Sequence, residues 1–272
     1  MPASALAFAL AAAVFHALWN LLLARARDIE SATVIALITA EVVFAPVALA
    51  VWRVDSAVWP WIVGSGLFEI AYFALLATAY RRAPLSVVYP VARGGAPVLV
   101  LGVSVVALGH ATSWRQAGAV AVVVLGILLV RGLRQADPAG LAFGLAIASC
   151  IAGYTLVDKR GIQHAGPIPY LELSMLGPTV IYAAAVLRVR GRVAVRSAVG
   201  APAIVAGIAT FVAYAFVLAA LQRASAASVA AVRETSVVVA AALAAVVLKE
   251  KVGPVRIAGA VLVVCGVALL AS

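Results

Sequence analysis

The 272-residue chain is 66% hydrophobic and 11% charged, with a mean hydropathy of +1.15, whereas soluble domains are about 45–50% apolar and about 25% charged. A water-soluble globule must keep a polar exterior, so this composition excludes one and indicates helices that face lipid or one another. The net charge of +10 falls mostly in short gaps between apolar runs, as in loops beside lipid headgroups, and no basic patch with interleaved aromatics points to nucleic acid.

Ten apolar segments are each close to the roughly 20 residues that a membrane-spanning helix needs. They cover residues 4–24, 31–52, 57–80, 85–109, 114–131, 138–158, 166–188, 199–222, 227–248 and 254–271. The connections are too short to fold alone, so the sequence predicts an all-α integral membrane protein with ten transmembrane helices. The first segment has no cationic stretch before it, and we expect it to be a retained helix rather than a cleaved signal.

The two halves of the chain resemble each other along several of these segments. Residues 7–11 (AFALA) align with residues 142–146 (AFGLA). The same comparison pairs Pro46 with Pro178, Arg93 with Arg233, and, to within one residue, Glu41 with Glu172. Repeats of five helices, an odd number, must lie in the membrane with opposite orientation, which is the inverted-repeat design of many secondary transporters. We therefore expect five-helix repeats at 1–135 and 136–272, with a substrate site between them.

Two segments carry a family resemblance. Residues 79–86 (AYRRAPLS) are followed by Pro90 and Pro97, and residues 248–253 (LKEKVG) are followed by IAGA at 257–260 and by Cys265 and Gly266. These segments are similar to the EamA family of the drug/metabolite transporter superfamily. The resemblance implies a transporter of ten helices in two repeats, with both termini in the cytoplasm.

Titratable side chains inside the predicted spans are the main functional candidates. An ionised group at the centre of a membrane helix costs about 3 kcal/mol, so such groups are rare unless they serve a pathway or an ion pair. They are His16, Glu41, Glu69, Arg93, Glu172, Arg233 and Glu234.

Arg93 lies in the segment YPVARGGAP (89–97), whose prolines and glycines weaken the helix and free backbone groups. Tyr89 is one turn earlier on the same helix face. A fixed guanidinium beside an aromatic ring suits a carboxylate, phosphate or phosphonate ligand. Alternatively, Glu69 or Glu41 neutralises Arg93 and the pair locks two helices together.

Arg233 mirrors Arg93, and we expect it to face the same pathway. Its neighbour Glu234 points about 100° away on a continuous helix, so the two side chains are not expected to face one partner. Glu234 is then free to pair with an arginine across the cavity.

Glu41 and Glu172 are matched carboxylates, each five or six residues before a proline. Buried carboxyl groups can exchange protons near neutral pH, so these two residues, with Glu69 and Glu234, are candidates for proton coupling or for charge pairs. The alternative for the matched pair is an interhelical hydrogen bond or ion pair.

His16, Trp19 and Asn20 share one face of the first helix, because their spacing is i, i+3 and i+4. They are candidates for a polar substrate site, although a membrane histidine also serves as a hydrogen-bonded packing residue. Tyr72, Tyr89, Tyr154 and Tyr214 are further substrate-binding candidates, and anchoring at the membrane interface is the alternative for Tyr72, Tyr154 and Tyr214.

Enzyme signatures such as HExxH, a P-loop or GxSxG are missing, so we expect no enzyme, metal or cofactor. Cys150 and Cys265 lie in apolar runs without a CxxC pattern and fit packing roles.

The orientation of the chain receives two conflicting predictions. Lys and Arg number 13 after the odd-numbered segments and 5 after the even-numbered ones. The positive-inside rule then puts both termini outside, whereas the family resemblance implies that both are in the cytoplasm.

The sequence thus predicts a multi-pass secondary transporter in the inner (cytoplasmic) membrane, moving a small polar or anionic metabolite by alternating access. A proton gradient or exchange would drive it. Its expected partners are a small-molecule substrate and membrane lipid, with a homodimer left open. The alternatives are a lipid-linked flippase, a multidrug exporter of the same fold, and a membrane enzyme or scaffold, for which the sequence offers few polar interface residues.

Overall fold

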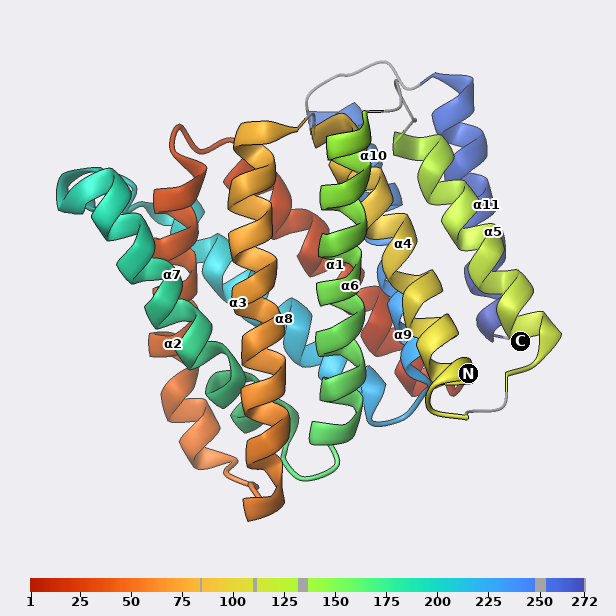
Figure 1. Ribbon diagram of the computed structural model, residues 1–272, viewed down its shortest axis with the longest axis horizontal. Coiled ribbons are helices and arrows are strands. Elements are labelled where there is room, and N and C mark those ends of the chain that lie inside the picture. Colours follow the sequence, from red (N-terminus) through yellow and green to blue (C-terminus); the bar gives the residue numbers. More distant parts are fainter. Residues whose placement is uncertain (84, 110–111, 132–136, 248–252, 272) are drawn as a thin grey trace.

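The computed structural model describes residues 1–83, 85–109, 112–131, 137–247 and 253–271. These parts are helical, and the β contact that they contain is one isolated bridge between Val54 and Ala165. The helices form one bundle (Figure 1). They are α1 (Ala3–Ala24), α2 (Ile29–Ala50), the 3-10 turn η1 (Ser56–Val58), α3 (Trp59–Arg82), α4 (Leu85–Val106), α5 (Trp114–Arg131), α6 (Pro138–Gly161), α7 (Pro167–Ser197), α8 (Ala201–Leu221), α9 (Ala226–Arg233), α10 (Ser236–Val247) and α11 (Pro254–Ala271).

Most predicted spans coincide with a single helix to within three residues at each end. Local capping explains several of these boundaries. Asp28 accepts a hydrogen bond from the Ser31 amide and begins α2, and Asp137 accepts one from the Gly140 amide and begins α6. Pro138 then occupies the first turn of α6, where no amide hydrogen is needed.

Two predicted segments are wrong in detail. Helix α7 extends to Ser197 and turns at Gly191, whose φ of 81° favours glycine, so much of the predicted connection 189–198 is helical. The segment 227–248 is not one helix, because α9 ends at Arg233 and α10 begins at Ser236. Between them the amides of Glu234 and Thr235 bond carbonyls three residues back, at 3.2 and 3.0 Å. This tight turn interrupts the span at its charged residues.

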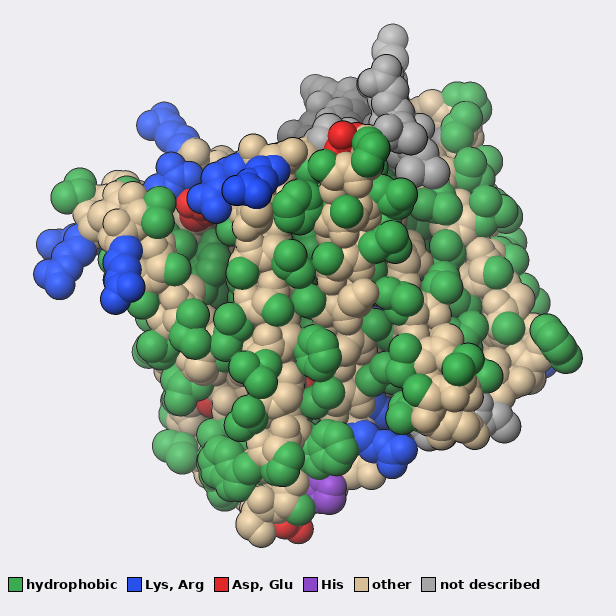
Figure 2. Space-filling view, in the orientation of Figure 1, with side chains coloured by type: hydrophobic (Ala, Val, Ile, Leu, Met, Phe, Trp, Pro, Cys, Tyr) green, Lys and Arg blue, Asp and Glu red, His purple; other side chains and the backbone are tan. Residues whose placement is uncertain are grey.

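The exterior of the bundle is apolar. Seven of the described helices are long and apolar enough to cross a membrane, namely α1, α2, α3, α4, α6, α7 and α8, and two shorter apolar stretches lie in α5 and α11. Large aliphatic side chains such as Val42 and Leu67 are 68% and 62% exposed on the outer surface. Charged side chains gather at the ends of the helices, with an apolar band between (Figure 2). The chain is a multi-pass helical membrane protein.

Helices from the two halves of the chain pack against each other throughout the bundle. Helix α1 packs on α8 and α3 packs on α6, while α5 and α11 form a pair at one side (Figure 1). In that pair Gly126 faces Gly259 so closely that a Cβ atom on Gly126 would lie 2.7 Å from the Gly259 carbonyl oxygen. Small residues permit such close backbone contact between helices in lipid.

Candidate functional site

A cavity of about 860 Å³ lies inside the bundle, a volume that suits a small-molecule ligand. Its wall takes side chains from α1 to α4 and from α6 to α10, so both halves of the chain enclose it. The described residues of α5 and α11 do not contribute to this wall.

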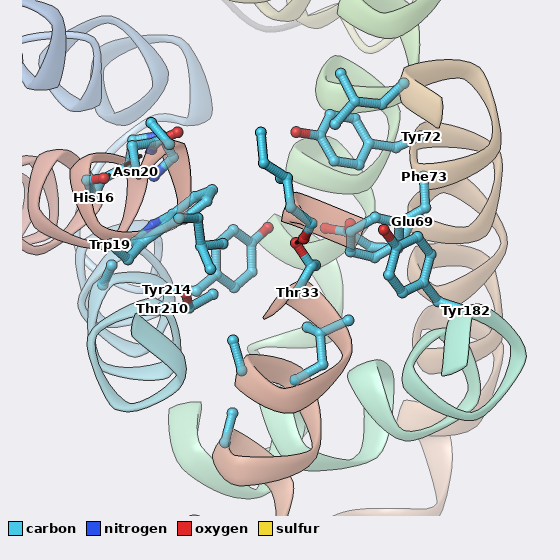
Figure 3. A pocket seen from close by; sticks show the side chains of 18 of the residues that line it. His16, Trp19, Asn20, Thr33, Glu69, Tyr72, Phe73, Tyr182, Thr210 and Tyr214 are labelled. Atoms are coloured by element: carbon cyan, nitrogen blue, oxygen red, sulfur yellow. Dashed lines mark hydrogen bonds between the residues drawn. The ribbon is translucent and has the colours of Figure 1, made fainter. Parts of the chain in front are cut away.

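Most of the predicted site residues line this cavity, from helices far apart in the sequence. They are His16, Trp19, Asn20, Glu41, Glu69, Tyr72, Tyr89, Arg93, Tyr154, Tyr214 and Arg233. Figure 3 shows the three residues of α1 on one side, opposite Glu69, Tyr72 and Phe73 of α3. The two remaining candidates, Glu172 and Glu234, lie behind the wall, against Glu41 and against the arginines.

Arg93 is held by two partners from different helices. Its Nη1 atom lies 3.3 Å from Oε1 of Glu234, which is fully buried, and its Nη2 donates to Nε2 of His16. The predicted neutralising partners, Glu69 and Glu41, are therefore wrong. The ion pair instead joins α4 to the turn between α9 and α10.

Arg233 and Glu234 lie within ion-pair distance of each other at the turn between α9 and α10. The helix ends at Arg233, and the turn brings Oε1 of Glu234 to 3.7 Å from Nε of Arg233. One carboxylate oxygen thus serves both arginines. That 3.7 Å separation is too long for a hydrogen bond, and Nε and Nη2 of Arg233 have no hydrogen-bond partner within the described structure.

Glu41 and Glu172 meet where α2 packs on α7. Thr179 donates to Oε1 of Glu41 at 3.3 Å, and the carboxyl group of Glu172 is near enough to interact with Glu41. Each residue keeps one buried oxygen, Oε2, without a hydrogen-bond partner in the described parts of the chain. For Glu41 the alternative of an interhelical hydrogen bond is present, with Thr179 of α7 as the donor, and the role of the two acids in proton coupling stays a prediction.

Aromatic rings form much of the cavity wall. Tyr154 lies edge-on between Tyr72 and Tyr214, with ring centroids 6.4 and 5.9 Å away. The ring of Trp19 stands edge-on to His16 at 4.9 Å. Since these three tyrosines line the cavity, the structure favours the cavity over interface anchoring for them.

Asp158 is a buried acid that the sequence did not single out. It accepts hydrogen bonds from Tyr170, at 2.8 Å, and from Tyr214, and it is fully buried. In the sequence it stood at the end of a predicted span, directly before Lys159 and Arg160. Tyr214 also lines the cavity, so Asp158 forms part of the cavity's support.

The cavity reaches the arginine-rich end of the bundle. Arg27, Asp28, Glu30, Arg81 and Arg190 lie on its wall there. Nε of Arg190 donates to Oε2 of Glu30 at 2.8 Å, bridging α7 and α2. Lys and Arg side chains gather at this end, in the upper left of Figure 2.

The opposite end of the bundle is closed by paired connections. The Asp55 amide donates to the His164 carbonyl, and the Gly166 amide donates to the Arg53 carbonyl, both at 2.8 Å. The described residues of these two connections do not line the cavity. Both termini lie at this closed end, where the Met1 amino group donates to the Leu270 carbonyl at 3.1 Å (Figure 1).

This geometry predicts a sided labelling pattern. In a cysteine-free background, Thr33→Cys on the cavity wall should react with an impermeant thiol reagent from the arginine-rich side, and Gln163→Cys should react from the other side. Labelling in intact cells and in inverted vesicles also decides the orientation. The positive-inside rule predicts that Thr33→Cys reacts from the cytoplasm, while the family resemblance predicts this for Gln163→Cys. Reaction of both from one side would contradict the fold.

Asp28 predicts a modest dependence of stability on pH. Partial burial acts to raise its pKa, but hydrogen bonds from Ser31 and the charge of Arg190 outweigh this and lower it. Because the pKa of Asp28 is lower in the folded protein, ionised Asp28 stabilises the fold when the pH is above the ordinary pKa of an aspartate. This stabilisation is lost as the pH falls through the lowered pKa. Asp28→Ala should reduce the free energy of unfolding by about 1 kcal/mol at neutral pH, through the lost helix cap. An equally large difference at pH 2 would contradict this explanation.

Comparisons with known proteins agree with this architecture. Residues 138–272, from α6 onward, match the model of the EamA-like transporter family. No curated protein matches the chain. A crystal structure described only as that of a protein matches with a TM-score of 0.80 and 19% sequence identity, over 99% of this chain and 96% of that chain. At this identity the likeness shows the fold.

The family predicted from the sequence is confirmed by the match to its model. It is a family of transporters and not of enzymes. The match covers the second of the two segments that carried the resemblance, of which residues 248–252 lie outside the described residues.

Proposed function

The chain belongs to the EamA-like transporter family through residues 138–272, and we propose that it is a secondary transporter of a small polar or anionic metabolite in the cytoplasmic membrane. The observation that carries this proposal is the cavity of about 860 Å³ between the halves of the chain, with buried charges on its wall. Such charges are costly in a membrane protein unless they serve a pathway or a partner.

We further propose that ten spans form two inverted five-helix repeats, 1–135 and 136–272. The helix contacts support this arrangement, because they recur when each helix is exchanged for its counterpart in the other half. Thus α1 packs on α8 as α6 packs on α3, and α2 packs on α8 as α7 packs on α3. The pairs α2–α7 and α5–α11 map onto themselves. This is the pattern of a twofold axis in the membrane plane.

Alternating access would exchange the open and closed ends of the cavity. In the present conformation the cavity extends to the arginine-rich end, whose residues line it. At the opposite end, backbone hydrogen bonds join the two connections. The symmetry-related contact at the open end is the ion pair between Arg190 and Glu30, which joins α7 to the start of α2. Inverted repeats permit two such states, because each half can adopt the conformation of the other.

A proton gradient or substrate exchange would drive the transport. No ATP-binding motif occurs in the sequence. The contacting carboxyl groups of Glu41 and Glu172, together with Glu69 on the cavity wall, are the candidate proton carriers. Protonation of one of a close pair of acids removes their mutual repulsion, which links proton binding to the packing of α2 on α7.

Transport by the purified protein in liposomes tests this function. Vesicles are screened for uptake of small metabolites with and without an imposed pH gradient. Arg93→Ala and Arg233→Ala should abolish uptake while the variants still purify as folded protein, and Arg223→Ala, which has an exposed side-chain contact at the closed end, is the control. Normal uptake in both cavity variants would refute the proposed site. Dependence on Glu69 or Glu41 in place of the arginines would favour a hydrophobic cation as cargo.

A further inference from the structure

The two buried arginines beside the cavity share one acidic partner. Arg93 and Arg233 both face one carboxylate oxygen, Oε1 of Glu234, at 3.3 and 3.7 Å. Guanidinium groups stay charged at every pH that a protein tolerates. A single carboxylate oxygen is therefore the ion-pair partner that both arginines share within the described structure.

The two arginines differ in how their donors are used. Arg93 donates to Glu234 and to His16, so both of its terminal nitrogens have a partner. Arg233 is 3% exposed and lies on the cavity wall, yet its Nε and Nη2 have no hydrogen-bond partner among the residues that the structure describes. The unused hydrogen-bond donors therefore belong to Arg233 rather than to its repeat counterpart.

The two unused donors of Arg233 form one edge of the guanidinium group. The Nε and Nη2 hydrogens point the same way, in the fork that binds two oxygens of a planar carboxylate. Buried donors without partners are rare in folded proteins unless a ligand or water completes them. This edge has the geometry of a carboxylate site.

The surroundings of Arg233 suit a carboxylate ligand whose remaining part is apolar. Tyr154 and Tyr214 line the same cavity as Arg233. Their edge-to-face packing leaves ring surface on the cavity wall, which also includes Ile151 and Phe211.

We infer that Arg233 is the anion-binding point of the cavity, and that it takes an organic monocarboxylate with a flat apolar body. This inference deepens the proposed transport function and rests on it for its biological meaning. Arg93 is then a positioning residue, which holds Glu234 and His16 in place beside the ligand.

Binding of three matched probes to the purified protein in detergent tests the inference. The probes are 3-phenylpropionate, its amide and 3-phenylpropylamine, which share one body and differ in charge. Isothermal titration should give a carboxylate affinity at least roughly tenfold above that of the amide, as expected for a charged hydrogen-bonded contact. A wild-type preference for the amide or the amine would overturn the inference without any variant.

Variants then assign the preference to Arg233. Arg233→Gln should bring the carboxylate affinity down to that of the amide, with the amide affinity kept as evidence of folding. Arg233→Lys should restore part of the preference, since a lysine keeps the charge but not the two-donor edge. Arg223→Gln, whose exposed side chain lies outside the cavity wall, is the control and should bind like wild type. An unchanged preference in Arg233→Gln would overturn the assignment.

Uptake of the same probes into liposomes separates this inference from the transport function. If the protein bound the carboxylate preferentially but took up no probe or metabolite, the anion site would be supported and the transport function would be refuted. If the protein took up the amine but did not bind the carboxylate, the transport function would be supported and the anion site would be refuted.

Discussion

Glu234→Ala is expected to lower the free energy of unfolding by about 3–5 kcal/mol, because it leaves two buried arginines without their shared counter-charge. Glu234 is fully buried, so water cannot replace it without opening the turn between α9 and α10. The midpoint of thermal unfolding of the purified protein in detergent should therefore fall strongly.

Two variants identify charge as the cause of this effect. Glu234→Gln keeps the size of the side chain and one acceptor oxygen, so it should destabilise less than Glu234→Ala. Glu69→Ala is the matched control. Glu69, on α3, is a buried acid like Glu234, but it makes no ion pair within the described structure. If Glu69→Ala destabilised the protein as much as Glu234→Ala, the shared ion pair would not be the explanation.

Gly126→Ala is expected to destabilise the bundle by about 1–3 kcal/mol through overpacking between α5 and α11. A Cβ atom there would lie 2.7 Å from the Gly259 carbonyl oxygen and 2.8 Å from the Val263 amide, and neither backbone group can move without separating the helices. Thermal unfolding in detergent measures this effect.

Gly118→Ala is the control within the same helix. A Cβ atom at Gly118 meets nothing within 4 Å in the described structure. Since alanine favours helix over glycine, Gly118→Ala should leave stability unchanged or raise it slightly. Equal effects of the two substitutions would mean that close packing of α5 on α11 is not required.

Much of the fold and of the cavity wall could be predicted from residue spacing. Apolar length alone located most helices. The spacing of His16, Trp19 and Asn20 put them on one helix face, and all three line the cavity. Charged residues are rare in membrane spans because they are costly unless they serve a pathway or an ion pair. Arg93 and Arg233 therefore stood out in the sequence as site candidates.

The sequence allowed Glu234 to pair with an arginine, but spacing along the chain could not identify which arginine. Arg93 pairs with Glu234, which is 141 residues away, rather than with Glu69 or Glu41. That choice depends on the turn between α9 and α10, and the sequence 227–248 contains no proline or glycine to signal a break. Asp158 was missed because its partners come from other helices, while its sequence neighbours, Lys159 and Arg160, indicated a solvent-facing end.

Blocking the cavity tests the central claim most directly, namely that a small molecule crosses the membrane through it. Asn20→Cys, in a Cys150→Ala and Cys265→Ala background, places a thiol on the cavity wall, and Val193→Cys places one at an 84% exposed position outside it. Both proteins are reconstituted into liposomes, and uptake is measured before and after reaction with a bulky maleimide. Uptake should be lost on modification of Asn20→Cys and kept on modification of Val193→Cys. Unchanged uptake after complete modification of Asn20→Cys would contradict the account.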